Sequence, residues 1–283
     1  LVAAAKKKGF NAVPLGLKAN LSFANSVRRQ ASNNVVGILP GKTHPDEYVI
    51  YSAHWDHLGR CEPINGDGIC NGALDNATGT GGLIALAEAH AKAGAADRSI
   101  VFLSVTAEES GLLGSAYYGA NPVFPLNQTV GGINMDGLNV IGRTRDVTVV
   151  GIGKSELEPI LARYAKAQGR VITPEASPEK GSFFRSDHFS LAKYGVPMIY
   201  FGSGEDMTEG GQAAGHAARE DYTTNRYHKP QDEYRADWNW SGAIEDLTLN
   251  YEIGRELAGG AGWPNWYPSA EFRGIRDKSR AGK

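Results

Sequence analysis

Two adjacent acidic residues follow one of the most apolar segments of the chain. Glu108 and Glu109 lie in the sequence VFLSVTAEESGLLGS, between a strand-like run and a helix-like run. Two carboxylates at the end of a buried strand repel each other and lose hydration, so the fold alone gives little reason for them. A metal gives a reason, because one glutamate can bind the ion while the other acts as general base on a bound water. The alternative is a solvated helix start, where the helix dipole favours acids.

Two other segments place a histidine or an aspartate at the end of an apolar run or just before an apolar helix. His54 and Asp56 belong to AHWDH, which directly follows the apolar run EYVIYSA. Such a histidine can bind a metal while the aspartate steadies it, although a surface histidine beside an aspartate is also common. Asp75 lies in the glycine-rich GALDNATGTGG, just before a long apolar helix. Its carboxylate is either an ordinary helix cap or a ligand that bridges two cations.

The last two candidates are ordinary when each is taken alone. Asp136 ends a short apolar strand in GGINMDG, and His228 lies in the proline-containing segment YHKPQDEY. All the candidates together comprise two histidines, two glutamates and two aspartates besides Asp56. This is the set of nitrogen and oxygen ligands that zinc accepts, so their joint occurrence indicates a metal site.

The segments that must position these residues alternate between two types. Continuous apolar runs rich in valine and isoleucine predict buried strands at residues 35–39, 47–53, 99–105 and 147–152. Helices are predicted over residues 78–94, 110–120, 155–169 and 241–258, whereas the polar residues 202–225 read as a surface excursion. We therefore expect an α/β fold, a three-layer sandwich with a mixed, mainly parallel central sheet and helices on both faces. Ligands bind such sheets at the carboxyl ends of strands.

Length and charge limit the remaining classes of protein. The 283 residues are 41% hydrophobic, which suits one large domain over residues 1–283. A formal net charge of −2, with both signs spread along the chain, selects neither nucleic acid nor an anionic membrane as partner. No apolar run reaches the roughly 18 to 20 residues of a membrane helix, so we expect no membrane insertion.

The two cysteines favour an oxidising compartment. Cys61 and Cys70 flank the loop CEPINGDGIC, whose ends can easily meet, and the chain has no other cysteine. A local disulfide is therefore the favoured prediction. A cysteine metal pair is the alternative, but the CxxC spacing and nearby partners are missing.

The five metal-site segments, in this order, resemble the co-catalytic di-zinc aminopeptidase family that includes bacterial secreted leucyl aminopeptidases. The resemblance runs from about residue 34 to 258 and implies two zinc ions per chain. It implies that His54 and Asp136 bind one ion, that Glu109 and His228 bind the other, and that Asp75 bridges both. Asp56 would orient His54, and Glu108 would be the general base.

The same resemblance implies residues that contact the substrate. Tyr227 matches a family tyrosine that can donate a hydrogen bond to the tetrahedral oxyanion. The segment RSDHFSLAKYGVPMIYF resembles one near the family's substrate pocket, which places Asp187, His188 and Phe184 there. A helix cap by Ser186 or Asp187 is the structural alternative.

The sequences AHWDHLG and YHKPQDE resemble a bacterial branch that often carries a signal peptide and an inserted protease-associated domain. The first residues of this chain, LVAAAKKKGF, lack the order of charge before apolar residues that a signal peptide has. The resemblance therefore implies a secreted or periplasmic protein whose upstream part is missing from this chain.

The expected activity is removal of N-terminal amino acids from peptides. Two alternatives within the superfamily are a carboxypeptidase of the glutamate carboxypeptidase type and a glutaminyl cyclase. The first needs cations for a substrate carboxylate, and Arg185, Arg219 and Arg226 are available. The second uses one zinc, which the retention of all five ligand positions argues against. A non-catalytic relative of this fold should have lost ligands or the base.

Overall fold

The computed structural model describes residues 1–27 and 29–282. They form two compact units, Leu1–Ala31 and Ser32–Lys283, which are considered separately. The described residues of the first unit contain one short helix, α1 (Val2–Ala5), and all are exposed. The second unit contains the other helices and strands. A single catalytic domain over residues 1–283 stays a prediction.

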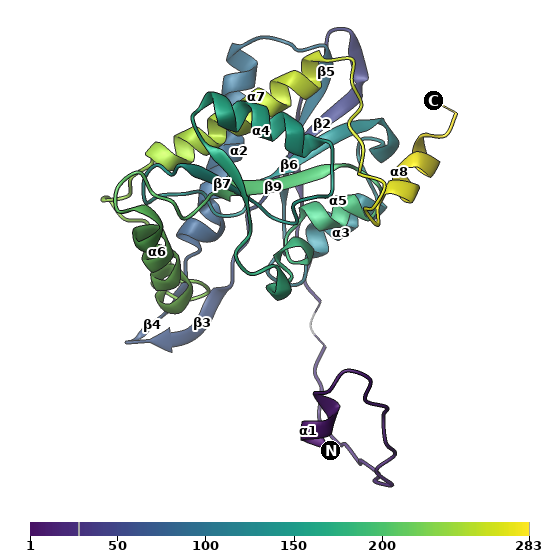
Figure 1. Ribbon diagram of the computed structural model, residues 1–283, viewed down its shortest axis with the longest axis vertical. Coiled ribbons are helices and arrows are strands. Elements are labelled where there is room, and N and C mark those ends of the chain that lie inside the picture. Colours follow the sequence, from purple (N-terminus) through teal and green to yellow (C-terminus); the bar gives the residue numbers. More distant parts are fainter. Residues whose placement is uncertain (28, 283) are drawn as a thin grey trace. The chain divides into compact units, whose positions relative to one another are not determined.

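A seven-stranded mixed sheet forms the centre of the second unit (Figure 1). Its strands are β1 (Val35–Leu39), β2 (His44–His54), β5 (Arg98–Val105), β6 (Thr129–Asn134), β7 (Asp146–Val149), β8 (Val171–Pro174) and β9 (Met198–Ser203). They lie in the order β1-β5-β2-β6-β9-β7-β8. The central strands β5, β2, β6 and β9 are parallel to their neighbours in this group. β1 is antiparallel to β5, and β7 to β9, so the predicted mixed, mainly parallel sheet is confirmed.

Helices cover both faces of the sheet, which is why the strands are apolar without interruption. In β2, Val49 and Tyr51 face one core while Ile50 faces the other. The first core includes side chains of α2 (Gly79–Lys92), α4 (Leu157–Ala167) and α7 (Ser241–Gly259). The second includes side chains of α3 (Leu113–Ala120) and α5 (His188–Ala192). The predicted α/β sandwich is confirmed.

Other elements lie outside these layers. They are the two-stranded hairpin of β3 (Gly59–Ile64) and β4 (Asp67–Cys70), and the helices α6 (Gly211–Asn225) and α8 (Arg273–Arg280). Short helical turns lie at η1 (Ala73–Thr78), η2 (Leu126–Gln128), η3 (Pro178–Lys180) and η4 (Ser182–Phe184). Among the described residues, no helix combines the length and apolar character needed to cross a bilayer.

Residues 202–225 were expected to be a surface excursion, and their second half does lie at the surface, but it forms a helix that the sequence analysis did not predict. Residues 211–225 form α6, in which only Gly215 is buried. Several alanines supply the helix propensity here, but a helix that buries almost none of its surface has no apolar stripe to reveal it.

Candidate metal centre

The predicted metal ligands come from strand ends and from two loops. His54 is the last residue of β2, Asp136 follows β6 by two residues, and Glu109 follows β5 by four. Because β5, β2 and β6 are parallel, their carboxyl ends meet at one edge of the sheet. Asp75 in η1 and His228 in the loop after α6 complete the set. The structure brings all five predicted ligands together.

The carboxylate of Asp75 lies between the two histidines. Its Oδ1 is 3.3 Å from Nε2 of His54, and its Oδ2 is 3.3 Å from Nε2 of His228. His54 Nε2 is also 3.1 Å from Oδ1 of Asp136, and His228 Nε2 is 3.0 Å from Oε2 of Glu109. The five residues therefore form two groups that share Asp75.

These groups fit zinc by spacing and by chemistry. Tetrahedral zinc with bonds of about 2.0 Å keeps its ligand atoms about 3.3 Å apart, close to the observed separations. Imidazole nitrogens and carboxylate oxygens are ligands that zinc accepts. The side chains of His54 and Glu109 are only 1% and 6% exposed, and burying so many charges is costly without a cation.

The turn after β5 positions both glutamates. Gly114 donates its backbone N–H to the Thr106 carbonyl at 2.9 Å, which folds the chain back at the start of α3. A Cβ on Gly114 would lie 2.1 Å from that oxygen, so only glycine permits this close approach. The Asp56 carboxylate accepts the backbone N–H groups of Glu108 and Glu109 at 3.1 and 3.4 Å.

Asp56 contacts His54 through its main chain. Nδ1 of His54 lies 3.0 Å from the carbonyl oxygen of Asp56 and 3.8 Å from its carboxylate. A hydrogen bond to that carbonyl leaves Nε2 free to face Asp75 and Asp136. The orienting role assigned to Asp56 stays a prediction, with the backbone carbonyl as the nearer partner.

In the metal-free protein the histidines supply the positive charge of the cluster. Burial lowers the pKa of His54, but hydrogen bonds to Asp136 and Asp75 raise it overall to about 12. Hydrogen bonds to Asp75 and Glu109 raise the pKa of His228 to about 9. Burial acts to raise the pKa of Asp75, yet its bonds to the two histidines hold it below its usual range. Both histidines must lose a proton before they can bind a metal.

Glu108 differs from its neighbour in its electrostatics. Burial, then the nearby Asp136 carboxylate, raise the pKa of Glu108 to about 9 in the metal-free protein. Although burial acts to raise the pKa of Glu109 as well, the contacts of its carboxylate with His228 and with the nearby ring of His57 lower that pKa. The two adjacent glutamates therefore have environments that favour opposite protonation states, as a base and a ligand require.

Polar side chains of the Asp75 loop tie the ligand segments to one another. Asn76 donates from Nδ2 to the Met135 carbonyl at 3.1 Å, and its Oδ1 accepts the Gly137 N–H at 2.9 Å. Thr80 donates its hydroxyl to the His54 carbonyl at 2.8 Å. These bonds fix the loop that carries Asp75 against the strand ends that carry Asp136 and His54.

Asp232 positions the Asp75 loop from the other side, and the sequence analysis missed it. This 1% exposed residue accepts the backbone N–H of Leu74 at 2.9 Å and that of Asp75 at 3.1 Å. Tyr222 donates its hydroxyl to the same carboxylate at 3.3 Å. Asp232 lies four residues after His228 in YHKPQDEY, so it joins the two loops that carry ligands. Its position in the same proline-containing loop as His228 was the only sequence signal that could have pointed to this role.

The residues predicted to contact substrate lie in two environments. Tyr227 stacks on His228 with ring centroids 3.8 Å apart, and the Phe184 side chain is half exposed. Asp187 and His188 are fully buried, and burial raises the pKa of Asp187 to about 7 and lowers that of His188 to about 3. Ser186, which directly precedes Asp187 in the sequence, donates its hydroxyl to Oδ2 of Asp136 at 2.7 Å.

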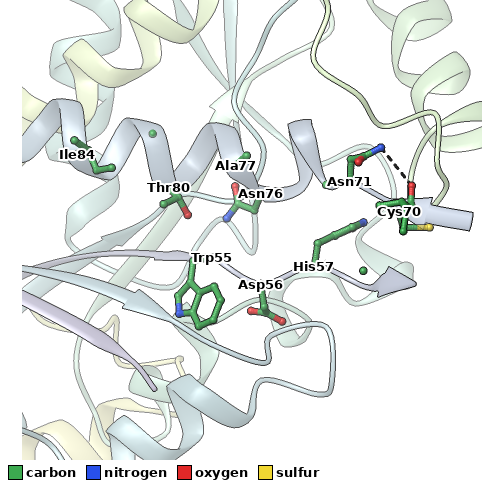
Figure 2. Close-up of a pocket in the computed structure, with 13 residues that line it drawn as sticks. Trp55, Asp56, His57, Cys70, Asn71, Asn76, Ala77, Thr80 and Ile84 are labelled. Carbon is green, nitrogen blue, oxygen red and sulfur yellow. Dashed lines mark hydrogen bonds between the residues drawn. The ribbon is translucent and has the colours of Figure 1, made fainter. Parts of the chain in front are cut away.

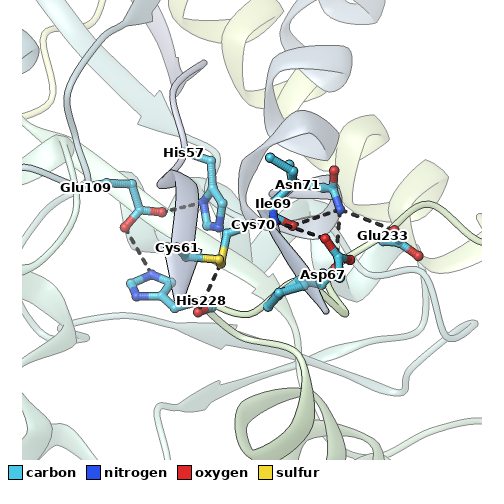
Figure 3. Close-up of a disulfide and its surroundings, with 10 residues drawn as sticks. His57, Cys61, Asp67, Ile69, Cys70, Asn71, Glu109, His228 and Glu233 are labelled. Carbon is cyan, nitrogen blue, oxygen red and sulfur yellow. Dashed lines mark hydrogen bonds and ion pairs between the residues drawn. A yellow bond between two sulfur atoms is a disulfide. The ribbon is translucent and has the colours of Figure 1, made fainter. Parts of the chain in front are cut away.

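The predicted disulfide is present and closes the hairpin of β3 and β4. Cys61 and Cys70 have their Cα atoms 5.9 Å apart. Sγ of Cys70 lies 3.6 Å from the carbonyl oxygen of His228 (Figure 3). Figure 2 shows a pocket of about 570 Å³ between this hairpin and α2, lined on one side by His57. The hairpin is therefore part of the wall beside the second ligand group.

The sequence of residues 34–251 matches the family described as peptidase family M28. Mouse aminopeptidase NAALADL1 is 34% identical over 129 residues, which are 44% of this chain and 16% of that protein. The rat protein of the same name gives the same values. The matched part thus spans about a sixth of these relatives.

Solved structures share the fold at lower identity. The zinc aminopeptidase BSAP from Bacillus subtilis matches with a TM-score of 0.59 and 20% identity, over 85% of this chain and 53% of that one. An aminopeptidase from Aneurinibacillus sp. strain AM-1 matches with a TM-score of 0.56 and 20% identity, over 81% and 48%. A glutaminyl cyclase from Bacteroides thetaiotaomicron matches with a TM-score of 0.54 and 16% identity, over 81% and 77%.

The family match covers more than three quarters of the chain and contains every predicted ligand. It confirms the resemblance found in the sequence, while the solved structures confirm the fold. The chain therefore belongs to peptidase family M28.

Proposed function

We propose that this protein is a di-zinc aminopeptidase, which hydrolyses the first peptide bond of substrates that have a free α-amine. Membership of a peptidase family supports a hydrolase that acts on peptides. The observation that carries the finer proposal is the placement of Asp75, whose two oxygens face the separate groups around His54 and His228. A carboxylate so placed can bridge two cations.

We assign the two zinc sites to these two groups. One ion would be held by His54, Asp136 and Asp75, and the other by His228, Glu109 and Asp75. When bound, such ions lower the pKa of the attacking water and polarise the substrate carbonyl.

The protein groups then divide the proton transfers between them. Glu108 accepts a proton from the attacking water and later returns it to the leaving amine. Burial and then the nearby Asp136 raise the pKa of Glu108 in the metal-free protein, and bound cations would act to lower it. Tyr227, whose pKa burial raises to about 12, stays protonated and can donate a hydrogen bond to the oxyanion.

Charge favours the amino end of the substrate. The centre is rich in carboxylates, and Glu108 and Asp136 lie close enough to affect each other's charge. A substrate ammonium beside Glu108 and Asp136 would gain from these acidic groups, whereas a substrate carboxylate there would be repelled. The half-exposed ring of Phe184 lies two residues before Ser186, which contacts Asp136, and it favours a bulky apolar first residue such as leucine. The disulfide supports a secreted or periplasmic location.

The test combines metal content with three substrates. Elemental analysis should find two zinc ions per chain, and leucine anilide should be hydrolysed while acetyl-leucine anilide is not. A peptide with a blocked amine and a free carboxyl end is the third substrate. If the blocked substrates turn over as well as the free one, the aminopeptidase assignment is wrong, and turnover of the third alone would indicate a carboxypeptidase.

A further inference from the structure

His57 is a buried histidine beside the second ligand group that the proposed set of ligands does not use. It follows His54 by three residues, and its side chain is 7% exposed. Gly72 makes room for it, because a Cβ at that position would lie 2.4 Å from Cγ of the His57 ring. The ring therefore occupies a space that a side chain on Gly72 would fill.

A ring nitrogen of His57 and a carboxylate oxygen of Glu109 lie close together, although neither has a hydrogen-bond partner. Nδ1 of His57 lies 2.7 Å from Oε1 of Glu109, on the side of that carboxylate opposite to His228 (Figure 3). This contact does not have the geometry of a hydrogen bond. Among the described residues, both ring nitrogens of His57 and Oε1 of Glu109 are buried without any hydrogen-bond partner. Orphaned polar atoms of this kind are rare in folded proteins and need an explanation.

A cation explains two of these atoms, one ring nitrogen of His57 and Oε1 of Glu109. Ligand atoms of His57, Glu109 and Asp75 lie within 4.8 Å of one another, as atoms that share an ion must. A histidine that only oriented Glu109 would donate a well-aligned hydrogen bond to it, which is how partners outside the coordination shell act. Here the nitrogen and the oxygen approach each other without that alignment.

We propose that His57 is an additional ligand of the second zinc ion, together with Asp75, Glu109 and His228. This inference rests on the proposed function, since it concerns one of the two sites assigned there. It makes the two sites unlike, because the first has one histidine and the second has two. The second site then has more nitrogen character, which favours zinc over harder cations.

The test measures zinc affinity and coordination for each site. His57→Ala and the larger His57→Gln are compared with His44→Ala, a control at an exposed histidine at the start of β2. Competition with a chromophoric chelator gives the two affinities, and the visible spectrum of the cobalt-substituted protein reports the ligands of the ion. Circular dichroism and occupancy of the first site show whether each variant is folded.

Both His57 variants should bind zinc at the second site at least 100-fold more weakly than the unaltered protein and should change the cobalt spectrum. His44→Ala should change neither quantity. Two sites of unaltered affinity in His57→Ala would overturn the inference. So would a weaker loss with an unchanged spectrum, which would make His57 a positioning residue.

Failure of the proposed function would look different in this experiment. It would appear in the unaltered protein, as failure to bind two zinc ions or to hydrolyse leucine anilide. An active protein with two zinc ions whose second site ignores His57 would overturn the inference about this residue alone.

Discussion

Replacing Glu108 by glutamine should abolish activity and at the same time stabilise the metal-free protein. Activity should fall about 10²- to 10⁴-fold, because the proton acceptor is lost while every ligand remains. The pKa of Glu108 rises from 4.5 to about 9 on folding, owing first to burial and then to Asp136. A group with a raised folded-state pKa contributes stability below its unfolded pKa and loses it as the pH rises toward the folded value. Glutamine removes this loss.

The magnitude follows from the pH interval between the unfolded pKa and the working pH. At pH 7 the full shift corresponds to about 3.4 kcal/mol, from roughly 1.4 kcal/mol for each pH unit above 4.5. Glu108 is partly exposed, and solvent screening reduces this value to about 1 to 2 kcal/mol. The melting temperature of Glu108→Gln should therefore exceed that of the unaltered protein by about 2 to 6 °C at pH 7.

The assay is thermal unfolding in the presence of a chelator at pH 5 and pH 8, together with turnover of leucine anilide in zinc. The gain should be small at pH 5 and larger at pH 8. Glu220→Gln, at an exposed position on α6, is the matched control and should change neither quantity. If Glu108→Gln and the unaltered protein melt at the same temperature at pH 8, the electrostatic argument is refuted. Near-normal turnover by Glu108→Gln would refute the assignment of Glu108 as the base.

Three further predictions follow from the site and its surroundings. Zinc binding should release protons and strengthen as the pH rises toward 9, because His54 and His228 are both protonated in the metal-free protein and the pKa of His228 is about 9. Calorimetry in buffers of different ionisation enthalpy measures this release. Asp232→Asn should lower zinc affinity about 10- to 100-fold, since one amide oxygen cannot replace both carboxylate oxygens that hold the Asp75 loop. Competition with a chelator measures this change, and an unaltered affinity would contradict the prediction. Replacing Cys61 and Cys70 by serine should cost roughly 2 to 3 kcal/mol of unfolding free energy in urea titrations, whereas two free thiols in the intact mass of the unreduced protein would contradict the disulfide.

The sequence predicted the sheet and the residues at its edge because both depend on local patterns. Short, continuous apolar runs rich in β-branched residues, such as residues 99–105, favour strands covered on both faces, and β5 spans that run. The acidic pair at Glu108 and Glu109 then had to lie at the carboxyl end of a parallel strand. Convergence with His54 and Asp136 followed from the shared direction of these strands.

The remaining parts of the site depend on contacts between distant segments. Asp232 binds backbone groups 157 and 158 residues away, so no pattern around it reveals that function. His57 lies beside Gly72 and Glu109 only because two loops meet at the end of the sheet. Helix α6 was missed for a different reason, since it packs almost no side chains into the core.

The unequal exposure of His54 and His228 has a consequence for metal exchange. The side chain of His54 is 1% exposed at the end of a central strand, whereas that of His228 is 34% exposed on a loop. An ion held partly by an exposed loop can be reached by a competing ligand without opening the sheet. A chelator should therefore remove the two ions in separate kinetic phases, the ion near His228 first. The protein would pass through a form that retains only the ion between His54 and Asp136.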